Sequence, residues 1–344
     1  MDFYRSEIFP FKQEIDLFFE HDVFSQFIQK YQSNYFTTHY FDVFKQHCKG
    51  GKCIRGYLVK LGYEIAANRQ NDNILYPAVA YEVFETSILA HDDIIDRSPI
   101  RRRIPSMHVA LGDKHKGISR SICVGDAGML LANALLLEAG YPAEICIKAL
   151  IHQTKIFSYT LSGELSDIDL SHTHAYSENQ VLNMYILKTS LYTVAGPLIL
   201  GAILGDATEE TIKALYDYGC SLGIAFQIVD DILGIFGDEE LTGKPITSDA
   251  AEGKKSILTA YFDKSVNGEE KEKFYKVYGH EMIDDKAMDA IREALISSGA
   301  YHYAKEKAKA FNQQALQSIE NSSISHNHKK VLYDLCSYMI ERKM

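Results

Sequence analysis

Apolar residues recur at the helical period along most of this 344-residue chain. In residues 11–31, for example, phenylalanine, isoleucine and valine follow one another at intervals typical of an amphipathic helix. Alternation of apolar and polar residues over the length of a strand is scarce. We therefore predict an all-α fold, with further helices over residues 52–67, 74–96, 118–139, 141–164, 177–204, 208–236, 286–320 and 327–342.

Composition limits the setting in which such a chain works. No linker rich in Pro, Gly or Ser divides it, so we expect a single domain over residues 1–344. The formal net charge of −10 argues against a nucleic-acid partner. The six cysteines are scattered without a CxxC pair, which indicates reduced thiols and a cytoplasmic location. We find no uncharged apolar run of the roughly 18 residues needed to span a bilayer, and expect no stable membrane anchor.

A cluster of carboxylates closes the apolar helix expected over residues 74–96. In His91-Asp92-Asp93-Ile94-Ile95-Asp96, the side chains of Asp92 and Asp96 are four residues apart and share one helix face. Like charges at this spacing repel one another, and the dipole at a helix C-terminus disfavours them further. Mg²⁺ would offset both penalties, because it binds carboxylate oxygens and shares its shell with phosphates. A solvated helix end explains a single cluster equally well.

A second cluster follows another apolar helix. Asp230 and Asp231 come after Phe226-Gln227-Ile228-Val229, and Asp238 lies seven residues beyond Asp231. Two such clusters, each followed by a loop that contains cations, predict one shared site for metal ions and diphosphate.

Several Lys and Arg residues accompany the aspartates. Arg101-Arg102-Arg103 follows the first cluster, and Gly51-Lys52-Cys53-Ile54-Arg55 places two cations at a helix start, where anions are favoured. Lys188-Thr189 lies among apolar residues, where a buried ammonium needs a partner. Lys244 and Lys254-Lys255 follow the second cluster. Each of these residues alone could be an ordinary cation on the protein surface. Together they provide enough positive charge to bind more than one diphosphate. A nucleotide-binding GxxxxGK[ST] loop is absent from the sequence.

These motifs, in this order, resemble the trans-prenyl diphosphate synthases, the family of farnesyl, geranylgeranyl and polyprenyl diphosphate synthases. The resemblance implies an isoprenoid synthase-type helical bundle around a deep central pocket, usually a homodimer. It implies condensation of isopentenyl diphosphate with an allylic diphosphate (dimethylallyl, geranyl or farnesyl), assisted by about three Mg²⁺ ions. Apolar walls would keep water from the allylic cation.

The resemblance also implies roles for individual residues. Mg²⁺ would be held by Asp92, Asp96 and Asp230, with Asp93 and Asp231 as additional or supporting carboxylates. Isopentenyl diphosphate would be bound by Lys52, Arg55 and Arg102. The allylic diphosphate would be bound by Arg101, Lys188, Gln227, Lys244 and Lys254. The leaving group would be positioned, and the cation shielded, by the catalytic residues Lys188, Thr189 and Gln227. The segment Gly163-Glu164-Leu165-Ser166-Asp167 resembles the helix that faces the allylic pocket.

Three positions depart from the family pattern. Glu85 stands where relatives usually have His or Gln near isopentenyl diphosphate, and its carboxylate would repel the anion unless it is paired or protonated. Arg103 replaces a usual glycine. Gly234 stands where many members have a third aspartate of the second cluster.

Product length is expected to depend on the side chains that close the pocket along the helix before Asp92. One turn back are Ser87 and Ile88, where farnesyl-type members commonly carry bulky aromatic residues. The next turn holds Phe84, with Tyr81 below it. We expect a product of geranylgeranyl length or longer.

Three other functions are open to this sequence. A terpene cyclase or head-to-head condensing enzyme of the same fold has related aspartate motifs, but a cyclase lacks the second diphosphate that Lys52, Arg55 and Arg102 would bind. A non-catalytic regulatory subunit of a prenyl synthase tends to lose aspartate or lysine ligands, whereas the first cluster is intact here. A helical metal-binding or scaffold protein would show no Mg²⁺ binding that depends on diphosphate.

Overall fold

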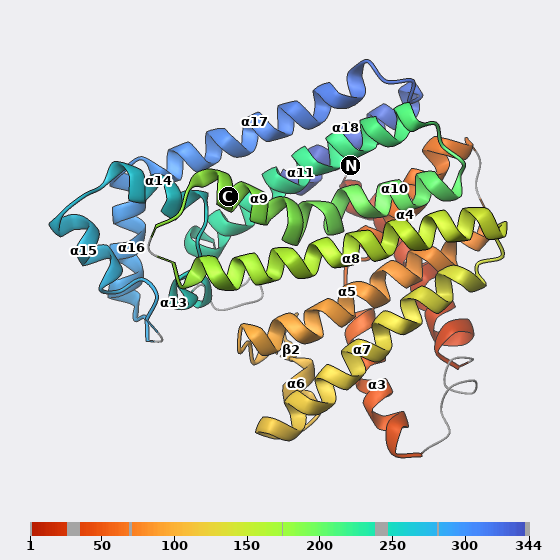
Figure 1. The fold of residues 1–344 in the computed structure, drawn as a ribbon, viewed down its shortest axis with the longest axis horizontal. Coiled ribbons are helices and arrows are strands. Elements are labelled where there is room, and N and C mark those ends of the chain that lie inside the picture. Colours follow the sequence, from red (N-terminus) through yellow and green to blue (C-terminus); the bar gives the residue numbers. More distant parts are fainter. Residues whose placement is uncertain are drawn as a thin grey trace. The chain divides into compact units, whose positions relative to one another are not determined.

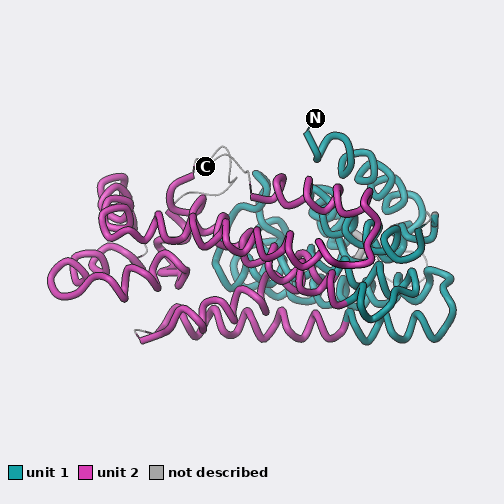
Figure 2. The backbone as a smooth tube through the Cα atoms, turned by 90° about the horizontal axis from the view of Figure 1, so that it is seen from above, with its two compact units in different colours: residues 1–153, 197–212 teal, residues 154–196, 213–344 magenta. Residues whose placement is uncertain are grey.

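The computed structural model describes residues 2–25, 35–68, 71–173, 175–237, 247–280 and 282–340, with only the backbone at residues 35–38 and 72. They form two compact units, residues 1–153 with 197–212 (unit 1) and residues 154–196 with 213–344 (unit 2) (Figure 2). Among the described residues the only strands are two of two residues each, so the prediction of an all-α fold is confirmed. The single domain over residues 1–344 stays a prediction.

Unit 1 is assembled around helix α5 (Leu75–Ile95), which packs along α7 (Lys114–Glu138) and against α4 (Ile54–Ala67) (Figure 1). Small and apolar side chains line α5, and every residue from Pro77 to Ser87 is buried. The backbone of α4 lies directly against α10 (Gly196–Leu204), because a Cβ atom at Gly62 would overlap the carbonyl of Leu198. The remaining elements of unit 1 are η1 (Tyr4–Ile8), α1 (Phe9–Phe18), η2 (Phe19–Phe24), α3 (Tyr35–Lys49), η3 (Asp72–Ile74), β1 (Ile100–Arg101), β2 (Ile104–Pro105), α6 (Met107–Ala110) and the start of α8 (Ala143–Ser171).

Unit 2 contains the rest of α8, α9 (Glu178–Tyr185), the π-helix η4 (Ile186–Ala195) and α11 (Glu209–Phe236). A capping box of Ser177 and Gln180 starts α9. The buried hydroxyl of Tyr218 in α11 donates to the carbonyl of Leu332 at 2.7 Å, which ties α11 to α18 (His326–Ile340). The other helices of unit 2 are α13 (Ser248–Glu252), α14 (Ile257–Ser265), α15 (Glu269–Tyr275), α16 (Asp285–Ser297) and α17 (Ala300–Glu320) (Figure 1).

The π-helix η4 is wider than an α-helix, and its neighbours approach it through glycines. A Cβ atom at Gly163 of α8 would overlap the backbone nitrogen of Lys188. Cβ atoms at Gly219 and Gly223 of α11 would overlap the backbones of Ala195 and Ser190. Side chains at these three positions would push the helices apart, so the glycines allow α8 and α11 to pack directly on η4.

Most predicted helices are confirmed to within a few residues, with the following differences. The helix predicted over residues 141–164 is too short, because α8 continues to Ser171. The helix predicted over 286–320 is two helices, because Gly299 has a left-handed backbone (φ +81°) that ends one and starts the next. The helices α3, α6, α13, α14 and α15 were not predicted.

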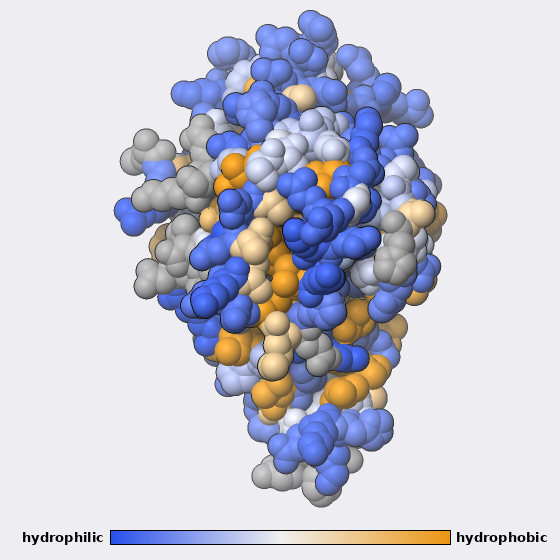
Figure 3. Space-filling view, turned by 90° about the vertical axis from the view of Figure 1, so that its left-hand side faces the viewer, coloured by the Kyte–Doolittle hydropathy of each residue, from blue (hydrophilic) through white to orange (hydrophobic). Residues whose placement is uncertain are grey.

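Within the described part of the chain, three helical stretches are long and apolar enough to cross a membrane, judged by length and composition: Lys114–Glu138, Glu178–Leu204 and Glu209–Phe236. Their most apolar windows are 44%, 72% and 56% buried within the protein. Hydrophilic residues predominate on the face drawn in Figure 3, and hydrophobic ones gather in patches between them. The expected lack of a membrane anchor stays a prediction.

Candidate active site

The first aspartate cluster lies where α5 ends. Asp96 caps the helix, and its amide donates to the carbonyl of Asp92 at 2.8 Å. The carboxylates of Asp92 and Asp96 offer oxygen atoms within 4.8 Å of one another. Carboxylates this close together can share a divalent cation, since Mg²⁺ takes carboxylate oxygens as ligands. The two residues therefore fit the metal role that the sequence predicts for them.

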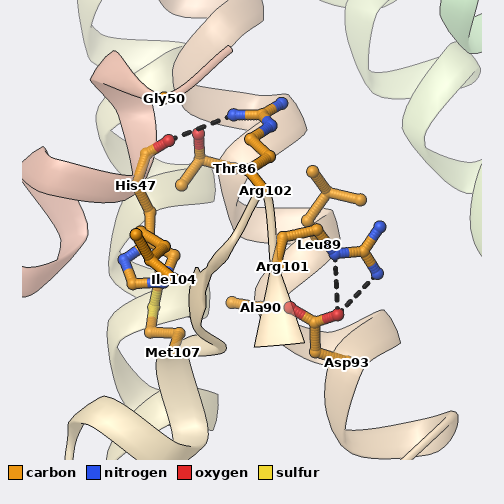
Figure 4. Close-up of a pocket in the computed structure, with 10 residues that line it drawn as sticks. All are labelled: His47, Gly50, Thr86, Leu89, Ala90, Asp93, Arg101, Arg102, Ile104 and Met107. Atoms are coloured by element: carbon orange, nitrogen blue, oxygen red, sulfur yellow. Dashed lines mark hydrogen bonds and ion pairs between the residues drawn. The ribbon is translucent and has the colours of Figure 1, made fainter. Parts of the chain in front are cut away.

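Arg101 lies against this cluster. Its Nη2 is 2.8 Å from Oδ2 of Asp92, and its Nε donates to Oδ1 of the buried Asp93 at 2.8 Å. Figure 4 shows the Arg101 guanidinium directed at Asp93. Asp93 thus supports the site by holding Arg101 in place. Asp92 contacts Arg101 as well, and would share its carboxylate between Arg101 and a metal ion.

A tight hairpin presents the arginines. Residues Ile100 and Arg101 pair with Pro105 and Ile104 in antiparallel register, so Arg102 and Arg103 occupy the turn. Both have left-handed backbones, with φ of +53° and +66°. Positive φ at both central residues is required in this kind of turn and favours glycine. That requirement gives a physical reason for the glycine that the family pattern has at the position of Arg103.

Arg55 and Arg102 converge on Glu85, the first of the three departures. Oε1 of Glu85 is 2.8 Å from Nη1 of Arg55 and 2.9 Å from Nη2 of Arg102. Arg102 also donates to the carbonyl of His47 at 3.2 Å (Figure 4). Gly51 makes room for this guanidinium, because a Cβ atom there would lie 3.0 Å from Arg102 Nη1. The exposed Lys52 follows Gly51 at the start of α4.

The ionisation of Glu85 follows from these contacts. Burial alone would raise the pKa of the Glu85 carboxyl, but the charges of Arg55 and Arg102 outweigh it and lower that pKa. Glu85 is therefore ionised and paired. Of the two ways to reduce its repulsion of a bound anion, pairing and protonation, this protein uses pairing.

Glu82 was not predicted as part of this site. Its Oε1 accepts the amide N–H of Gly56 at 2.7 Å, in the first turn of α4. Burial, and after it the neighbouring Glu85, raises the pKa of Glu82 to about 8. Glu82 lies one turn before Glu85 on α5, so the two side chains share a helix face, and this spacing could have indicated that Glu82 belongs to the site.

The residues predicted to set product length have different surroundings. Phe84 is buried and packs edge-on against Tyr81, with ring centroids 6.3 Å apart. Ser87 is fully buried against α7, where a Cβ atom at Gly128 would overlap its hydroxyl. Ile88 is half-buried. The small Ser87 is thus explained by helix packing as well as by a deeper pocket.

In unit 2, Lys188 has the partners that its apolar surroundings demand. Its ammonium is 2.6 Å from Oδ2 of Asp167 and 2.9 Å from Oε2 of Glu164, both on α8. The close approach of η4 to Gly163 brings these groups together. The segment that resembles the helix facing the allylic pocket therefore holds the predicted catalytic lysine.

A hydrogen-bonded chain links the other predicted residues of unit 2. Thr189 Oγ1 donates to Gln227 Oε1 at 2.7 Å, and Gln227 Nε2 donates to Asp231 Oδ1 at 2.8 Å. The Tyr185 hydroxyl donates to the other oxygen of Asp231 and accepts the amide of Ile257 at 3.0 Å. No motif in the sequence points to Tyr185.

The two aspartates of the second cluster are in different environments. Burial, reinforced by the charges of Asp249 and Asp230, raises the pKa of Asp231 to about 8 despite its hydrogen bonds from Tyr185 and Gln227. Asp230 is exposed. The exposed carboxylate suits a metal ligand, and Asp231 suits a supporting group, as the sequence predicts.

Asp249 lies beside Gly234, the third departure. Its Oδ1 is 3.0 Å from the ammonium of Lys254, which also lies 3.4 Å from Glu252. Asp249 was not predicted. The predicted ligand Lys244, and Asp238, lie outside the described residues.

Comparison with known proteins agrees with these features. A family model for polyprenyl synthetase matches residues 37–295. A geranylgeranyl diphosphate synthase of Sulfolobus acidocaldarius is 32% identical over 297 residues, which make up 86% of this chain and 88% of that protein. A geranylfarnesyl diphosphate synthase of Aeropyrum pernix is 30% identical over 295 residues, 85% of this chain and 91% of that protein.

The fold is also found among solved structures. A geranylgeranyl pyrophosphate synthase of Corynebacterium glutamicum, complexed with isoprenyl diphosphate and magnesium, matches with a TM-score of 0.91 and 26% identity, covering 98% of this chain and 99% of that one. The fold and the two clusters define a trans-prenyl diphosphate synthase, as the sequence predicts. The chain belongs to the polyprenyl synthetase family.

Proposed function

We propose that this protein condenses isopentenyl diphosphate with dimethylallyl, geranyl or farnesyl diphosphate, and releases an all-trans product of geranylgeranyl length or longer. The observation that carries the proposal is the convergence of Arg55 and Arg102 on one anionic oxygen, since two guanidiniums so placed suit a phosphate group. Two relatives at 32% and 30% identity, named for geranylgeranyl and geranylfarnesyl products, support the product length.

Each cluster of residues has its own task in this reaction. Arg101 and Lys254, together with Lys244, bind the allylic diphosphate, and Lys52, Arg55 and Arg102 bind isopentenyl diphosphate. Asp92, Asp96 and Asp230 would hold about three Mg²⁺ ions, which supply positive charge to the leaving diphosphate. Lys188, fixed by Glu164 and Asp167, adds a further positive charge, and Thr189 and Gln227 present hydrogen-bonding groups to the same reaction.

The bond changes balance without a further reactant. The allylic C–O bond breaks and leaves an allylic cation, and the double bond of isopentenyl diphosphate attacks that cation to form the new C–C bond. The released diphosphate accepts the proton that is then lost. Phe84, with Ser87 and Ile88 above it on α5, sets the length at which growth stops.

We also propose a cytoplasmic homodimer. Large apolar side chains are exposed along one side of α7 and the start of α8, foremost Leu130 at 72%. The others are Ile122, Leu137, Ile147 and Ile151. An exposed apolar face of this kind is typical of a protein–protein interface. The described cysteines are all free thiols, which suits a reducing compartment.

The function is tested by incubating labelled isopentenyl diphosphate with each allylic primer, with Mg²⁺ or with a chelator, and by sizing the products after dephosphorylation. Elongation that requires Mg²⁺ is the expected result. A cyclic hydrocarbon without elongation would favour the cyclase. No reaction with any primer would favour a regulatory subunit, and loss of Mg²⁺ binding that depends on diphosphate would favour a scaffold.

A further inference from the structure

Glu85 stands at the centre of the cluster that would bind isopentenyl diphosphate. One of its oxygens, Oε1, is within 2.9 Å of both Arg55 and Arg102. The Glu85 side chain is only 9% exposed, and those of the two arginines are 15% and 27% exposed. A phosphate oxygen that received hydrogen bonds from both guanidiniums would take the same place.

The surroundings fix this arrangement. Gly51 leaves space for the Arg102 guanidinium, and the carbonyl of His47 accepts a second hydrogen bond from it. The amide of Gly56, at the start of α4, is already bonded to Glu82. Glu82 also forms a side-chain hydrogen bond with Glu85, and the position of Glu85 on the long buried helix α5 allows it little movement.

The net charge of this cluster determines how strongly it attracts an anion. Two guanidiniums face one ionised carboxylate, so the cluster keeps only part of its positive charge for an incoming anion. A neutral residue that accepts the same hydrogen bonds would orient both arginines without cancelling their charge.

We propose that Glu85 is an internal counter-ion that occupies the place of a substrate oxygen between Arg55 and Arg102, and thereby weakens and sets the affinity for the diphosphate of isopentenyl diphosphate. This inference rests on the function proposed above. Glu85 acts as a positioning residue: it orients both guanidiniums in the free protein, and an anion binds only by displacing it or by tolerating its charge.

The test compares Glu85→Gln, Glu85→Ala and wild-type protein by calorimetric titration with isopentenyl diphosphate alone, which has no partner with which to react. Glutamine keeps the accepting oxygen and loses the charge, so we expect the Kd to fall about tenfold. The KM for isopentenyl diphosphate should fall in parallel, with kcat changed by less than about twofold. Alanine removes the oxygen as well, and we expect a smaller gain in affinity.

Glu64→Gln is the matched control. Glu64 lies on α4, about 13 Å along the helix from Arg55, and is paired with Lys60 at 3.5 Å. Its substitution removes the same charge from the same unit and should leave the Kd unchanged. Thermal melting of each variant confirms that it is folded.

An unchanged or higher Kd in Glu85→Gln would overturn the counter-ion role, and equal Kd values in the Gln and Ala variants would overturn the orienting role. The titration is repeated with inorganic diphosphate, and neither measurement needs turnover. A wild-type protein that binds these anions but elongates no primer would therefore contradict the proposed function and leave the comparison of Kd values intact.

Discussion

The carboxylate of Asp249 occupies the space into which a side chain at Gly234 would project. A Cβ atom at position 234 would overlap Asp249 Oδ2. Many relatives have an aspartate at the position of Gly234, but in this chain an aspartate from α13 comes to the same part of α11. From there it forms an ion pair with Lys254 at 3.0 Å.

We expect Gly234→Asp to damage this protein, although it restores the motif that is common in relatives. The new side chain would displace Asp249 from Lys254, at a cost of about 1–3 kcal/mol in the free energy of unfolding. Urea unfolding measures this loss. The double substitution Gly234→Asp with Asp249→Gly frees the space and should recover part of the stability, and equal stability of the single variant and the wild type would show that Asp249 can move aside at no cost.

Glu82 should make folding stability depend on pH. Its pKa is raised to about 8 in the folded protein from an ordinary value of 4.5. Between these values the unfolded chain has released the proton and the folded protein still binds it, so stability falls as pH rises. The contribution is complete below pH 4.5 and is lost as pH passes through about 8, with a slope of at most about 1.4 kcal/mol per pH unit.

Glu82→Gln has no proton to lose and can still accept the Gly56 amide. The difference in free energy of unfolding between the wild type and this variant, measured by urea unfolding from pH 5 to pH 8.5, should therefore change with pH in the direction stated above. A difference that stays constant over this range would show that Glu82 is ionised throughout it.

The exposed apolar side of α7 and α8 should hold the proposed dimer together. Leu130→Glu and Ile151→Glu place charges on this face and should convert the dimer into a monomer, as measured by light scattering during gel filtration. Leu17→Glu is the control, because Leu17 on α1 is 62% exposed but lies outside this face. A wild-type protein that elutes as a monomer would contradict the homodimer.

Product length should respond to Phe84. Phe84→Ala opens space below Ile88 on α5, so the dephosphorylated products should be longer by one or more five-carbon units. Because Phe84 is fully buried, the substitution also costs about 3–5 kcal/mol in stability. Phe84→Leu, which removes less volume, should give a smaller change in length at a lower cost. Products of unchanged length in both variants would place the end of the pocket on another helix.

The sequence predicted the parts of this protein that depend on local pattern. The period of 3.6 residues located most helices, and the order of charged motifs identified the family. The partners were harder to predict, because they depend on how helices pack. Nothing near Glu85 in the sequence shows that Arg55 and Arg102 share its oxygen, and nothing near Gly234 shows that Asp249 fills its space. Tyr185 was missed for the same reason, since its bond to Asp231 joins residues far apart in the chain.

The π-helix η4 limits how the gene for this protein can change. Gly163, Gly219 and Gly223 lie directly against its backbone, and Lys188 reaches Glu164 and Asp167 only in the present register. Inserting or deleting one codon within η4 would rotate one side of the helix against the other. The lysine would turn away from its partners, and side chains would meet the glycines. A change in the length of this segment should therefore be eliminated by selection.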